Sequence, residues 1–488
     1  MLSRAVQLSG RVRTLQRCCA LRFASSLHPL VRGLPAKLQQ QPKFSVSPKK
    51  IQILAKPTQF YSQLLEMIRH AQARIFISSL YLGSSESELV SALKEALIRR
   101  PELQVHMLFD LNRSTRPGSR STAKLLLPLR AQFPDRFHVS LFRSPSLRGI
   151  LAALVPPRFN EGWGTWHAKI YGVDDQVLIS GANLNESYFT DRQDRYLHFA
   201  DQRRLAQYCF DFIKTVSQFS FKLEPPESTT GPHSVRTDAY NILWPTPEIH
   251  PHHIHDTAER ALSNLQTTYL KTTPEHLDPQ QVTMFPLIQA GQFNIRDEEK
   301  ALKILFEHLN ELGGGLVDLT SGYFGLYKEY QDLILQSANV DCRIVASAPR
   351  ANGFYGSRGI SGRIPEGYTF LEQRFMNAVQ RAGRAGGVVL NEWEREGWTY
   401  HAKGIWLSTL TEPPMLTLFG STNLNSRSAH IDTELSFLML VPQDEIQLRK
   451  ELGAEVEAIR AYSGAWKGAE RSVRIGTKAL VGIVGGML

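Results

Sequence analysis

The sequence predicts an α/β protein made of two similar sandwich-like halves that share one site. A pattern of His-x-Lys, an apolar stretch and an asparagine-containing turn occurs twice, at 162–185 and 397–425. Each copy follows a strand-like segment, a helical pattern and a second strand-like segment. That order is typical of α/β layers.

Hydrophobic periodicity predicts the elements of the first half. RIFISSLYLG (74–83) is a short apolar run that predicts a strand. Leu89, Leu93 and Leu97 recur at helical spacing behind a serine-rich start, and LQVHMLFDL (103–111) predicts the next strand.

The second half repeats this order with LVDLTSGYFG (316–325), YKEYQDLILQSA (327–338) and DCRIVASAP (341–349), after helical patterns at 257–271 and 297–312. We therefore predict the halves at 50–221 and 257–465. Segment 222–256 is rich in Pro, Ser, Thr and His with little periodicity, which predicts a linker.

The positive charge of the chain is concentrated at its start. The formal net charge is +10, but residues 1–50 hold ten Lys and Arg and no acid, so the remaining chain is balanced at 46 basic and 46 acidic residues. An arginine-rich, acid-free start is typical of a mitochondrial transit peptide, and we predict one, disordered, at 1–45. A nucleic-acid-binding arm is the alternative.

The balanced body argues against nucleic acid as a partner. Cys209 and Cys342 alone lie outside the presumed transit peptide, too few for a disulfide scaffold or a zinc ribbon.

Any membrane contact is predicted to be peripheral, because no apolar run approaches the roughly 20 residues that cross a bilayer. Segment 147–159 and the tail 466–488 combine apolar residues with cations, so we expect them to contact anionic lipid. A core helix and a frayed tail are the alternatives.

The repeated motifs predict phosphoryl chemistry. Side chains two residues apart in a strand share a face, so His167 with Lys169, and His401 with Lys403, would enter one pocket. One neutral histidine would attack a phosphodiester while the other, protonated, donates to the leaving oxygen. The lysines, with Asn183 and Asn423, would hold the phosphate oxygens.

Carboxylates are scarce in both motifs, so we expect no metal and no cofactor. Each histidine needs a partner that fixes its tautomer. Asp194 follows His167 by 27 residues, and Glu434 follows His401 by 33 residues, a difference that equals a six-residue insertion in the second copy. We predict these two acids as the histidine-orienting groups.

HAKIYGVD (167–174) with GAN (181–183) resembles the HxKxxxxD motif of the phospholipase D superfamily, whose members carry two such motifs in one site. The resemblance implies two phospholipase D-like halves with one shared active site, and a catalytic role for Asp174. Segments 147–185 and 347–375 are similar to superfamily members that make phosphatidylglycerophosphate in mitochondria.

That resemblance implies transfer of a phosphatidyl group from CDP-diacylglycerol to glycerol 3-phosphate with release of CMP, toward cardiolipin. It also implies a location at the matrix face of the inner membrane.

The second copy departs from the motif, because Ser408 stands where Asp174 stands in the first. Asp174 is an odd number of residues from His167 and Lys169, so its alternative role is to brace the following turn. We predict His167 as the nucleophile and His401 as the general acid, with the reverse assignment open.

Substrate contacts are expected from two loops. Arg113 and Arg116 follow the second strand of the first half, and Tyr355 and Arg358 lie in a glycine-rich loop at the matching place in the second. Solvated loop charges are the alternative. Competing functions are a phosphodiesterase or nuclease, a cardiolipin- or phosphatidylserine-forming enzyme, and an inactive lipid-binding relative; the oligomeric state stays open.

Overall fold

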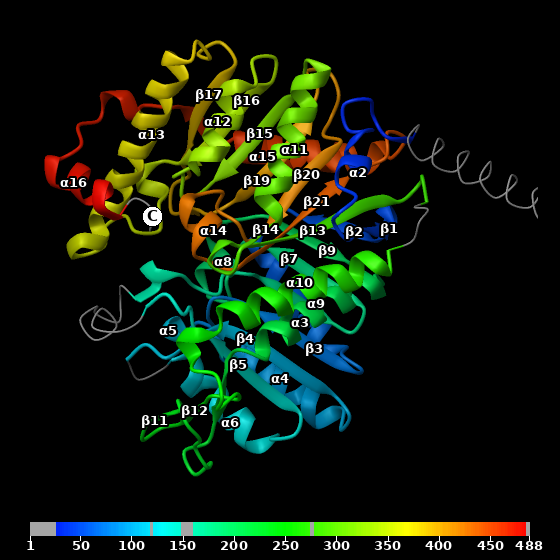
Figure 1. The fold of residues 1–488 in the computed structure, drawn as a ribbon, viewed down its shortest axis with the longest axis vertical. Helices are drawn as coiled ribbons and strands as arrows, with labels where there is room; N and C mark the ends of the chain where they lie inside the picture. Colours follow the sequence, from blue (N-terminus) through cyan, green and yellow to red (C-terminus); the bar gives the residue numbers. More distant parts are fainter. Residues whose placement is uncertain (1–25, 118–120, 148–159, 274–277, 485–488) are drawn as a thin grey trace, which may run out of the picture.

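The computed structural model describes residues 26–117, 121–147, 160–273 and 278–484. Two large mixed sheets, one in each half of the chain, dominate it. In Figure 1 the second half lies above the first, and α10 (His255–Lys271) crosses the middle between them.

The first sheet has its parallel strands at the centre, β3 with β4 and β4 with β5, while β6 pairs antiparallel with β3. Its strands in spatial order are β11 (Val235–Arg236), β12 (Asn241–Leu243), β10 (Phe221–Glu224), β5 (Phe137–Phe142), β4 (Gln104–Asp110), β3 (Arg74–Ser78), β6 (Ile170–Val173), β7 (Gln176–Ser180), β9 (Tyr196–Phe199) and β2 (Ile51–Leu54).

The second sheet repeats this arrangement, with β15 parallel to β16, β16 parallel to β17, and β19 antiparallel to β15. Its strands in spatial order are β1 (Phe44–Val46), β13 (Val282–Ala290), β21 (Glu434–Leu440), β20 (Leu416–Gly420), β19 (Lys403–Ser408), β15 (Leu316–Ser321), β16 (Asp341–Ser347), β17 (Val388–Trp393) and β22 (Ser463–Ala465), and β14 (Ile295–Arg296) pairs with β13.

Helices cover both sheets, as expected for layered α/β halves. Those of the first half are α3 (Pro57–Arg69), α4 (Ser87–Arg99), α5 (Leu111–Ser114), α6 (Thr122–Gln132), α8 (Ser187–Thr190) and α9 (Arg203–Ser217). Those on the side of the second half are α2 (Leu34–Lys37), α11 (Asp297–Leu312), α12 (Lys328–Gln336), α13 (Ile364–Arg381), α14 (Ser426–His430), α15 (Ile446–Arg460) and α16 (Ile475–Val484). The prediction of two repeated α/β halves is confirmed.

The structure differs from the sequence predictions in two segments. Residues expected to be disordered form α2 and β1, because Leu27, Val31 and Leu34 are buried in the second core and β1 pairs with β13. The expected linker 222–256 contains β11 and β12, which extend the first sheet beyond β10 through backbone hydrogen bonds that periodicity does not reveal. No helix among the described residues is long and apolar enough to cross a bilayer.

Arg195, just before β9, anchors the first half to the second. Its guanidinium donates two hydrogen bonds of 2.9 Å to Glu455 and one of 2.9 Å to the carbonyl of Leu418, and it stacks 3.8 Å from the ring centroid of Trp406. Arg195 is only 2% exposed. The charge is therefore paired and enclosed at the boundary between the halves.

Replacing Arg195 by methionine should lower the free energy of unfolding by about 3–5 kcal/mol, because Glu455 is left without its buried partner. Chemical denaturation would measure the loss. In the double variant Arg195→Met/Glu455→Gln, the loss in free energy of unfolding should be smaller than the sum of the losses in Arg195→Met and in Glu455→Gln. A change below about 1 kcal/mol in Arg195→Met would contradict the anchoring role.

Candidate active site

Each His-x-Lys segment reaches across to the other half. β18 (Thr399–Tyr400) pairs in parallel with β8 (Arg192–Gln193), and the N–H of His401 donates to the carbonyl of Gln193 at 2.8 Å. In the mirrored place Trp166 bridges Thr433, whose carbonyl accepts the N–H of His167 at 2.9 Å. These backbone contacts place His401 beside Asp194, which follows Gln193, and His167 beside Glu434, which follows Thr433.

The predicted carboxylates lie beside the histidines, and the pairing is crossed. Nδ1 of His401 lies 2.6 Å from Oδ2 of Asp194, and Nδ1 of His167 lies 2.9 Å from both oxygens of Glu434. An Nδ1–H that donates to a carboxylate leaves Nε2 as the reactive nitrogen. Side-chain exposure is 10% for His167 and 3% for His401, so His167 is the more accessible of the two.

Both motif lysines are buried in the same region. Nζ of Lys169 donates to the carbonyl of His167 at 2.5 Å, and Nζ of Lys403 lies 3.3 Å from Oδ2 of Asp194 and 2.6 Å from Nδ1 of His401. Burial lowers the pKa of both ammonium groups, although nearby carboxylates oppose the shift. The lysines place donors and positive charge where an anionic group could bind.

The ionisation of the site favours neutral histidines. Burial lowers the pKa of His167 and His401, and Lys403 lowers that of His401 further. Burial opposes ionisation of Asp194 and Glu434, but the adjacent lysines and histidines outweigh it and hold the pKa of each carboxyl below its usual value. Neutral imidazoles that donate to carboxylates satisfy both sets of shifts.

The two motif asparagines have different surroundings. Nδ2 of Asn183 donates to the Tyr188 hydroxyl at 3.0 Å, so part of this amide is engaged. Oδ1 of Asn423 is buried and has no partner among the described residues. The free group of Asn423 is thus a hydrogen-bond acceptor, whereas the donor group of Asn183 is engaged with Tyr188.

Asp174 lies outside the site, contrary to the catalytic role that the family resemblance implied. It stands at the far end of β6, about 20 Å from His167 along the strand. Its carboxylate accepts the backbone N–H groups of Gln72, Ala73 and Arg74 at 2.8–3.0 Å, and its φ is 52°. Asp174 therefore braces a turn.

The second half forms the equivalent turn without such a brace. Ser408, at the end of β19, pairs with Leu316, the first residue of β15. Gly313 and Gly315, in the turn that leads into Leu316, adopt φ values of 73° and 131°. Glycine reaches these angles at little cost, so this turn forms without a carboxylate at position 408.

The four residues predicted to contact substrate lie in two different environments, one paired with an acid and one exposed. The guanidinium of Arg113 lies 4.3 Å from the ring centroid of Tyr81 and 3.5 Å from Glu161, and Arg116 also pairs with Glu161. Tyr355 and Arg358 are exposed instead. Their loop approaches the site through Phe354, whose ring centroid lies 5.9 Å from that of Tyr323, two residues after the end of β15.

Residues 64–215 match the family model described as "Cardiolipin synthase, PLD-like domain". The CDP-diacylglycerol–glycerol-3-phosphate 3-phosphatidyltransferase of Schizosaccharomyces pombe is 37% identical over 86% of this chain and 91% of its own length. The chain belongs to this phosphatidyltransferase family. The family's Homo sapiens member, named mitochondrial, is 32% identical over 91% of this chain and 84% of its own length.

A solved structure supports the fold. The phosphatidylserine synthase of Haemophilus influenzae Rd KW20 superposes with a TM-score of 0.67, at 22% identity, over 94% of this chain and 98% of that one. The phospholipase D-like fold predicted from the sequence is confirmed.

Several residues that lie around the two histidines of this protein were not predicted from the sequence. Tyr188 contacts His401, and Arg192 donates to Thr399 at 2.9 Å. At the position matching Arg192, Asp432 accepts from Thr165 at 3.0 Å and pairs with Arg427. Arg192 stands two residues before Asp194, and Asp432 stands two residues before Glu434. This matching spacing in the repeat could have identified both residues as part of the site.

One cluster near His167 has the donor types of a cation site. Donor atoms of His167, Asp432 and Glu434 lie within 4.8 Å of one another. Those atoms are already engaged, since Arg427 and Thr165 donate to Asp432, and Ser428 and His167 donate to Glu434. The chemistry of this set fits a hydrogen-bonded ion cluster better than a cation cage.

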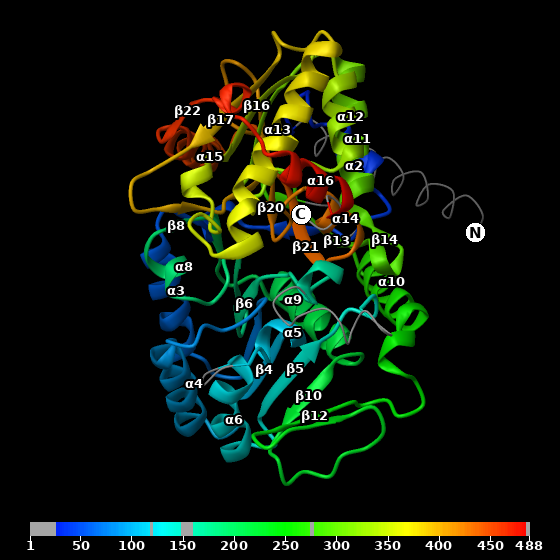
Figure 2. The same cartoon turned by 90° about the vertical axis from the view of Figure 1, so that its left-hand side faces the viewer.

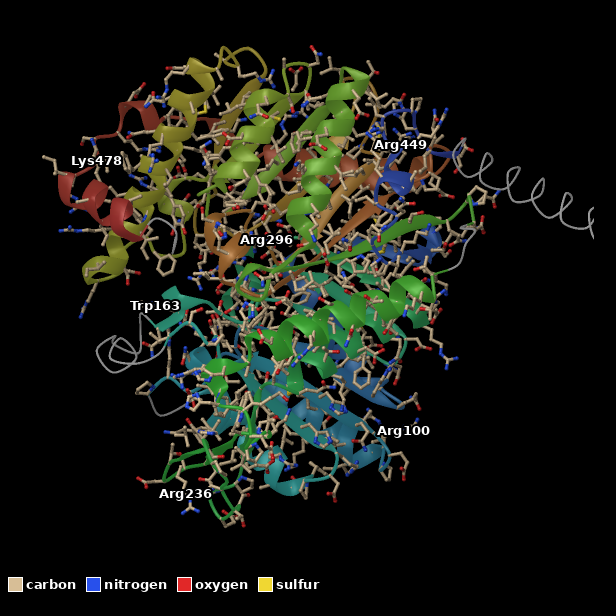
Figure 3. The ribbon with its side chains drawn as sticks, viewed as in Figure 1. Arg100, Trp163, Arg236, Arg296, Arg449 and Lys478 are labelled. Atoms are coloured by element: carbon tan, nitrogen blue, oxygen red, sulfur yellow. The ribbon has the colours of Figure 1, made fainter. Side chains whose placement is uncertain are left out.

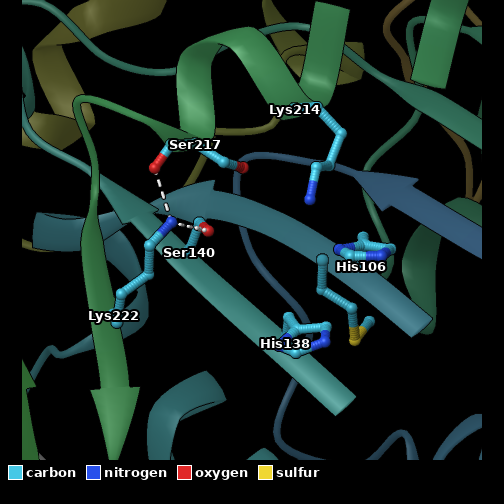
Figure 4. Close-up of a pocket in the computed structure, with 7 residues that line it drawn as sticks. His106, His138, Ser140, Lys214, Ser217 and Lys222 are labelled. Carbon is cyan, nitrogen blue, oxygen red and sulfur yellow. Dashed lines mark hydrogen bonds between the residues drawn. The ribbon is translucent and has the colours of Figure 1, made fainter. Parts of the chain in front are cut away.

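A cavity of about 180 Å³ lies away from the histidine pairs, around the starts of β4 and β5 (Figure 4). His106 and His138 stack there with ring centroids 4.8 Å apart, and Lys222 donates to Ser140 and to the carbonyl of Ser217. Asp110, at the other end of β4, accepts the N–H of Trp166 in the strand segment before His167. The cavity and the His-x-Lys site therefore occupy opposite ends of the first sheet.

Replacing Asp174 by alanine should lower the free energy of unfolding by about 1.5–3 kcal/mol, because charge-assisted hydrogen bonds to the turn are lost. Turnover by the folded fraction should stay within a few-fold of wild type. Denaturation and activity measured on the same preparation would test this, with Ser408→Ala as the matched control. A stable but inactive Asp174→Ala would restore a catalytic role.

The lowered pKa of His167 predicts the pH dependence of kcat/KM for the CDP-diacylglycerol substrate. The reactive neutral imidazole predominates above that pKa and is lost as pH falls through it, so the acid limb should lie below pH 6.5. Glu434 raises the pKa of His167, so Glu434→Gln should move the limb to lower pH. A limb above 6.5 would contradict a neutral resting His167.

Proposed function

We propose that the protein transfers the phosphatidyl group of CDP-diacylglycerol to glycerol 3-phosphate, giving phosphatidylglycerophosphate and CMP, toward cardiolipin. The observation that carries this conclusion is the pair of crossed histidine–carboxylate contacts in one site, His167 with Glu434 and His401 with Asp194. Two reactive imidazoles suit a reaction of two displacements through a covalent intermediate.

In the first displacement, Nε2 of His167 attacks the phosphorus that carries the diacylglycerol ester. A nitrogen–phosphorus bond forms, the phosphoanhydride bond breaks, and CMP departs with the bonding electrons. Glu434 holds the Nδ1 proton and stabilises the cationic character of the intermediate. The greater accessibility of the His167 side chain favours this histidine as the nucleophile.

In the second displacement, the hydroxyl of glycerol 3-phosphate attacks the same phosphorus. The nitrogen–phosphorus bond breaks, and the proton of the alcohol passes to Nε2 of His401. Burial and Lys403 lower the pKa of His401, so the neutral imidazole suits this base role and not the general-acid role that we predicted from the sequence. The first step needs little help from an acid, because the departing phosphate monoester has a second pKa of only about 6.

Cations and amides of the site would hold the substrate phosphates. Lys169 and Lys403 lie beside the two imidazoles, and their ammonium groups would bind the nonbridging oxygens together with the Nδ2–H donors of Asn423. Arg113 and Arg116 would meet the phosphate of the acceptor, which would replace Glu161 as their partner. No metal is part of this proposal.

The face that carries α13 and α16 is proposed to contact the membrane (Figure 2). Ile475 is 85% exposed and Ile360 is 57% exposed, and Arg474 and Lys478 lie among them on the surface. Figure 3 shows Lys478 and Trp163 on the same side of the molecule. Exposed apolar residues beside cations suit an anionic bilayer; most of segment 147–159 lies outside the described residues.

The protein acts in the mitochondrion, as several family members are named mitochondrial. We place it at the matrix face of the inner membrane, with the transit peptide within residues 1–25, since Leu27 and Val31 belong to a folded core. Residues 1–25 lie outside the described part of the chain.

Rapid mixing of the enzyme with labelled CDP-diacylglycerol in EDTA, without glycerol 3-phosphate, should release about one CMP per active site in a burst. The label should remain on His167 and be discharged by glycerol 3-phosphate. His167→Ala should abolish the burst. His401→Ala should keep it but slow discharge by about 10²–10⁴-fold, the usual contribution of a general base.

Three outcomes would contradict parts of the proposal. A burst in His167→Ala but not in His401→Ala would exchange the two roles. Phosphatidic acid formed in amounts that do not depend on glycerol 3-phosphate would indicate a hydrolase. Loss of the burst in EDTA, restored by one divalent cation, would show that a metal takes part.

A further inference from the structure

The two histidines differ in what contacts their reactive nitrogen. The hydroxyl of Tyr188 lies 3.3 Å from Nε2 of His401. Among the described residues, no side chain makes the equivalent contact with Nε2 of His167. Ser428 stands at the position of the second half that matches Tyr188, and its hydroxyl donates to Glu434 at 2.7 Å. The symmetry of the repeat is therefore broken at this residue.

A chain of hydrogen bonds fixes the direction of the Tyr188 contact. Nδ2 of Asn183 donates to the Tyr188 oxygen at 3.0 Å. Nδ1 of His401 lies 2.6 Å from Asp194 and 2.6 Å from Nζ of Lys403, and that ammonium group donates to the same carboxylate, so the Nδ1 proton is assigned to the contact with Asp194. With its Nδ1 proton directed at the carboxylate, a neutral His401 has its lone pair at Nε2. The phenol donates to that lone pair, and burial raises the pKa of Tyr188, which keeps it a neutral donor.

Aromatic rings enclose the same imidazole. The ring centroids of Tyr188 and Tyr323 lie 5.1 Å and 5.4 Å from that of His401, each at an interplanar angle of 83°. Arg192 lies 4.4 Å above the ring of Tyr188. Tyr188 is 3% exposed and His401 is 2% exposed. The base nitrogen of His401 is thus covered by a phenol and shielded from solvent.

We infer that the Tyr188 hydroxyl occupies the position of the acceptor alcohol at His401 and thereby makes the enzyme a transferase instead of a hydrolase. The inference rests on the proposed function, in which His401 accepts the proton of the attacking alcohol. Tyr188 is a positioning residue in this account.

Water and glycerol 3-phosphate differ in their ability to displace Tyr188. A displacing ligand must replace the hydrogen bond to Nε2 and disturb the packing of Tyr188 against Arg192. Glycerol 3-phosphate carries a dianionic phosphate that can bind nearby guanidinium groups, so its remote binding energy can drive the displacement. A water molecule has no second point of attachment, and the phosphohistidine is protected from it.

The alcohol then donates to Nε2 in place of the phenol. Its oxygen forms the new bond to phosphorus, the bond from phosphorus to His167 breaks, and its proton moves to His401. Tyr188 exchanges no proton in the net reaction, and it donates to Nε2 again after the product has left and His401 has released the alcohol's proton to solvent.

The test compares products in wild type, Tyr188→Phe and Tyr323→Phe, each full-length in detergent with labelled CDP-diacylglycerol and glycerol 3-phosphate. Tyr323→Phe is the matched control, because it removes the hydroxyl of the other ring packed against His401. CMP, phosphatidylglycerophosphate and phosphatidic acid are measured in the same samples, and thermal unfolding verifies folding.

In Tyr188→Phe the ratio of phosphatidic acid to phosphatidylglycerophosphate should rise at least about tenfold, equal to 1.4 kcal/mol of lost discrimination. The CMP burst should stay within about threefold of wild type, because His167 performs that step. In Tyr323→Phe the product ratio should stay at the wild-type value.

An unchanged ratio in Tyr188→Phe would overturn the inference, and so would an equal rise in both variants, which would indicate general loosening of the site. These failures are separate from failure of the proposed function, because a wild-type enzyme that releases no CMP, or makes no phosphatidylglycerophosphate, reveals the latter before any variant is considered.

Discussion

Two hydrogen-bonded pairs that cross between the halves, His401 with Asp194 and His167 with Glu434, hold the active site together. Short parallel contacts between the facing segments set them up, so each histidine and its carboxylate come from different sheets. Neither half contains a complete histidine–carboxylate unit. The reaction therefore depends on the packing of the halves, and the buried Arg195 that locks them together directly follows Asp194.

The cost of enclosing so many ionisable groups explains how the site is arranged. Isolated buried charges are strongly unfavourable, and buried ion pairs seldom add net stability. The carboxylates here are satisfied by imidazole, hydroxyl and ammonium donors, as when Ser428 and His167 donate to Glu434. The cluster provides preorganisation, because its hydrogen-bond donors already point to the place where phosphate charge would develop. Both histidines are neutral, so neither has to lose a proton before it can attack phosphorus or act as a base.

The repeat made much of this predictable from sequence, because matching intervals identified Asp194 and Glu434 as partners of the motif histidines and matching strands identified the two sheets. The crossing of the pairs was not predictable, since spacing along the chain does not say which half a carboxylate faces. Asp174 shows a related limit. The motif places it beside His167 in sequence, but the length of β6 carries it to the other end of the sheet. The N-terminal strand β1 was missed because its partner β13 is far away in sequence.

A duplicated fold produces two similar half-sites, yet the proposed two-step transfer needs two histidines with different tasks. A few side chains supply the difference. Gly181 stands where the second half has Ser421; a side chain at 181 would meet Lys403 and Asp194, whereas the Ser421 hydroxyl donates to Glu434. Arg192 and Asp432 give opposite charge to matching positions. Small changes within a shared backbone thus leave the His167 side chain the more exposed of the two and cover Nε2 of His401 with a phenol, which is the asymmetry that the proposed two-step transfer requires.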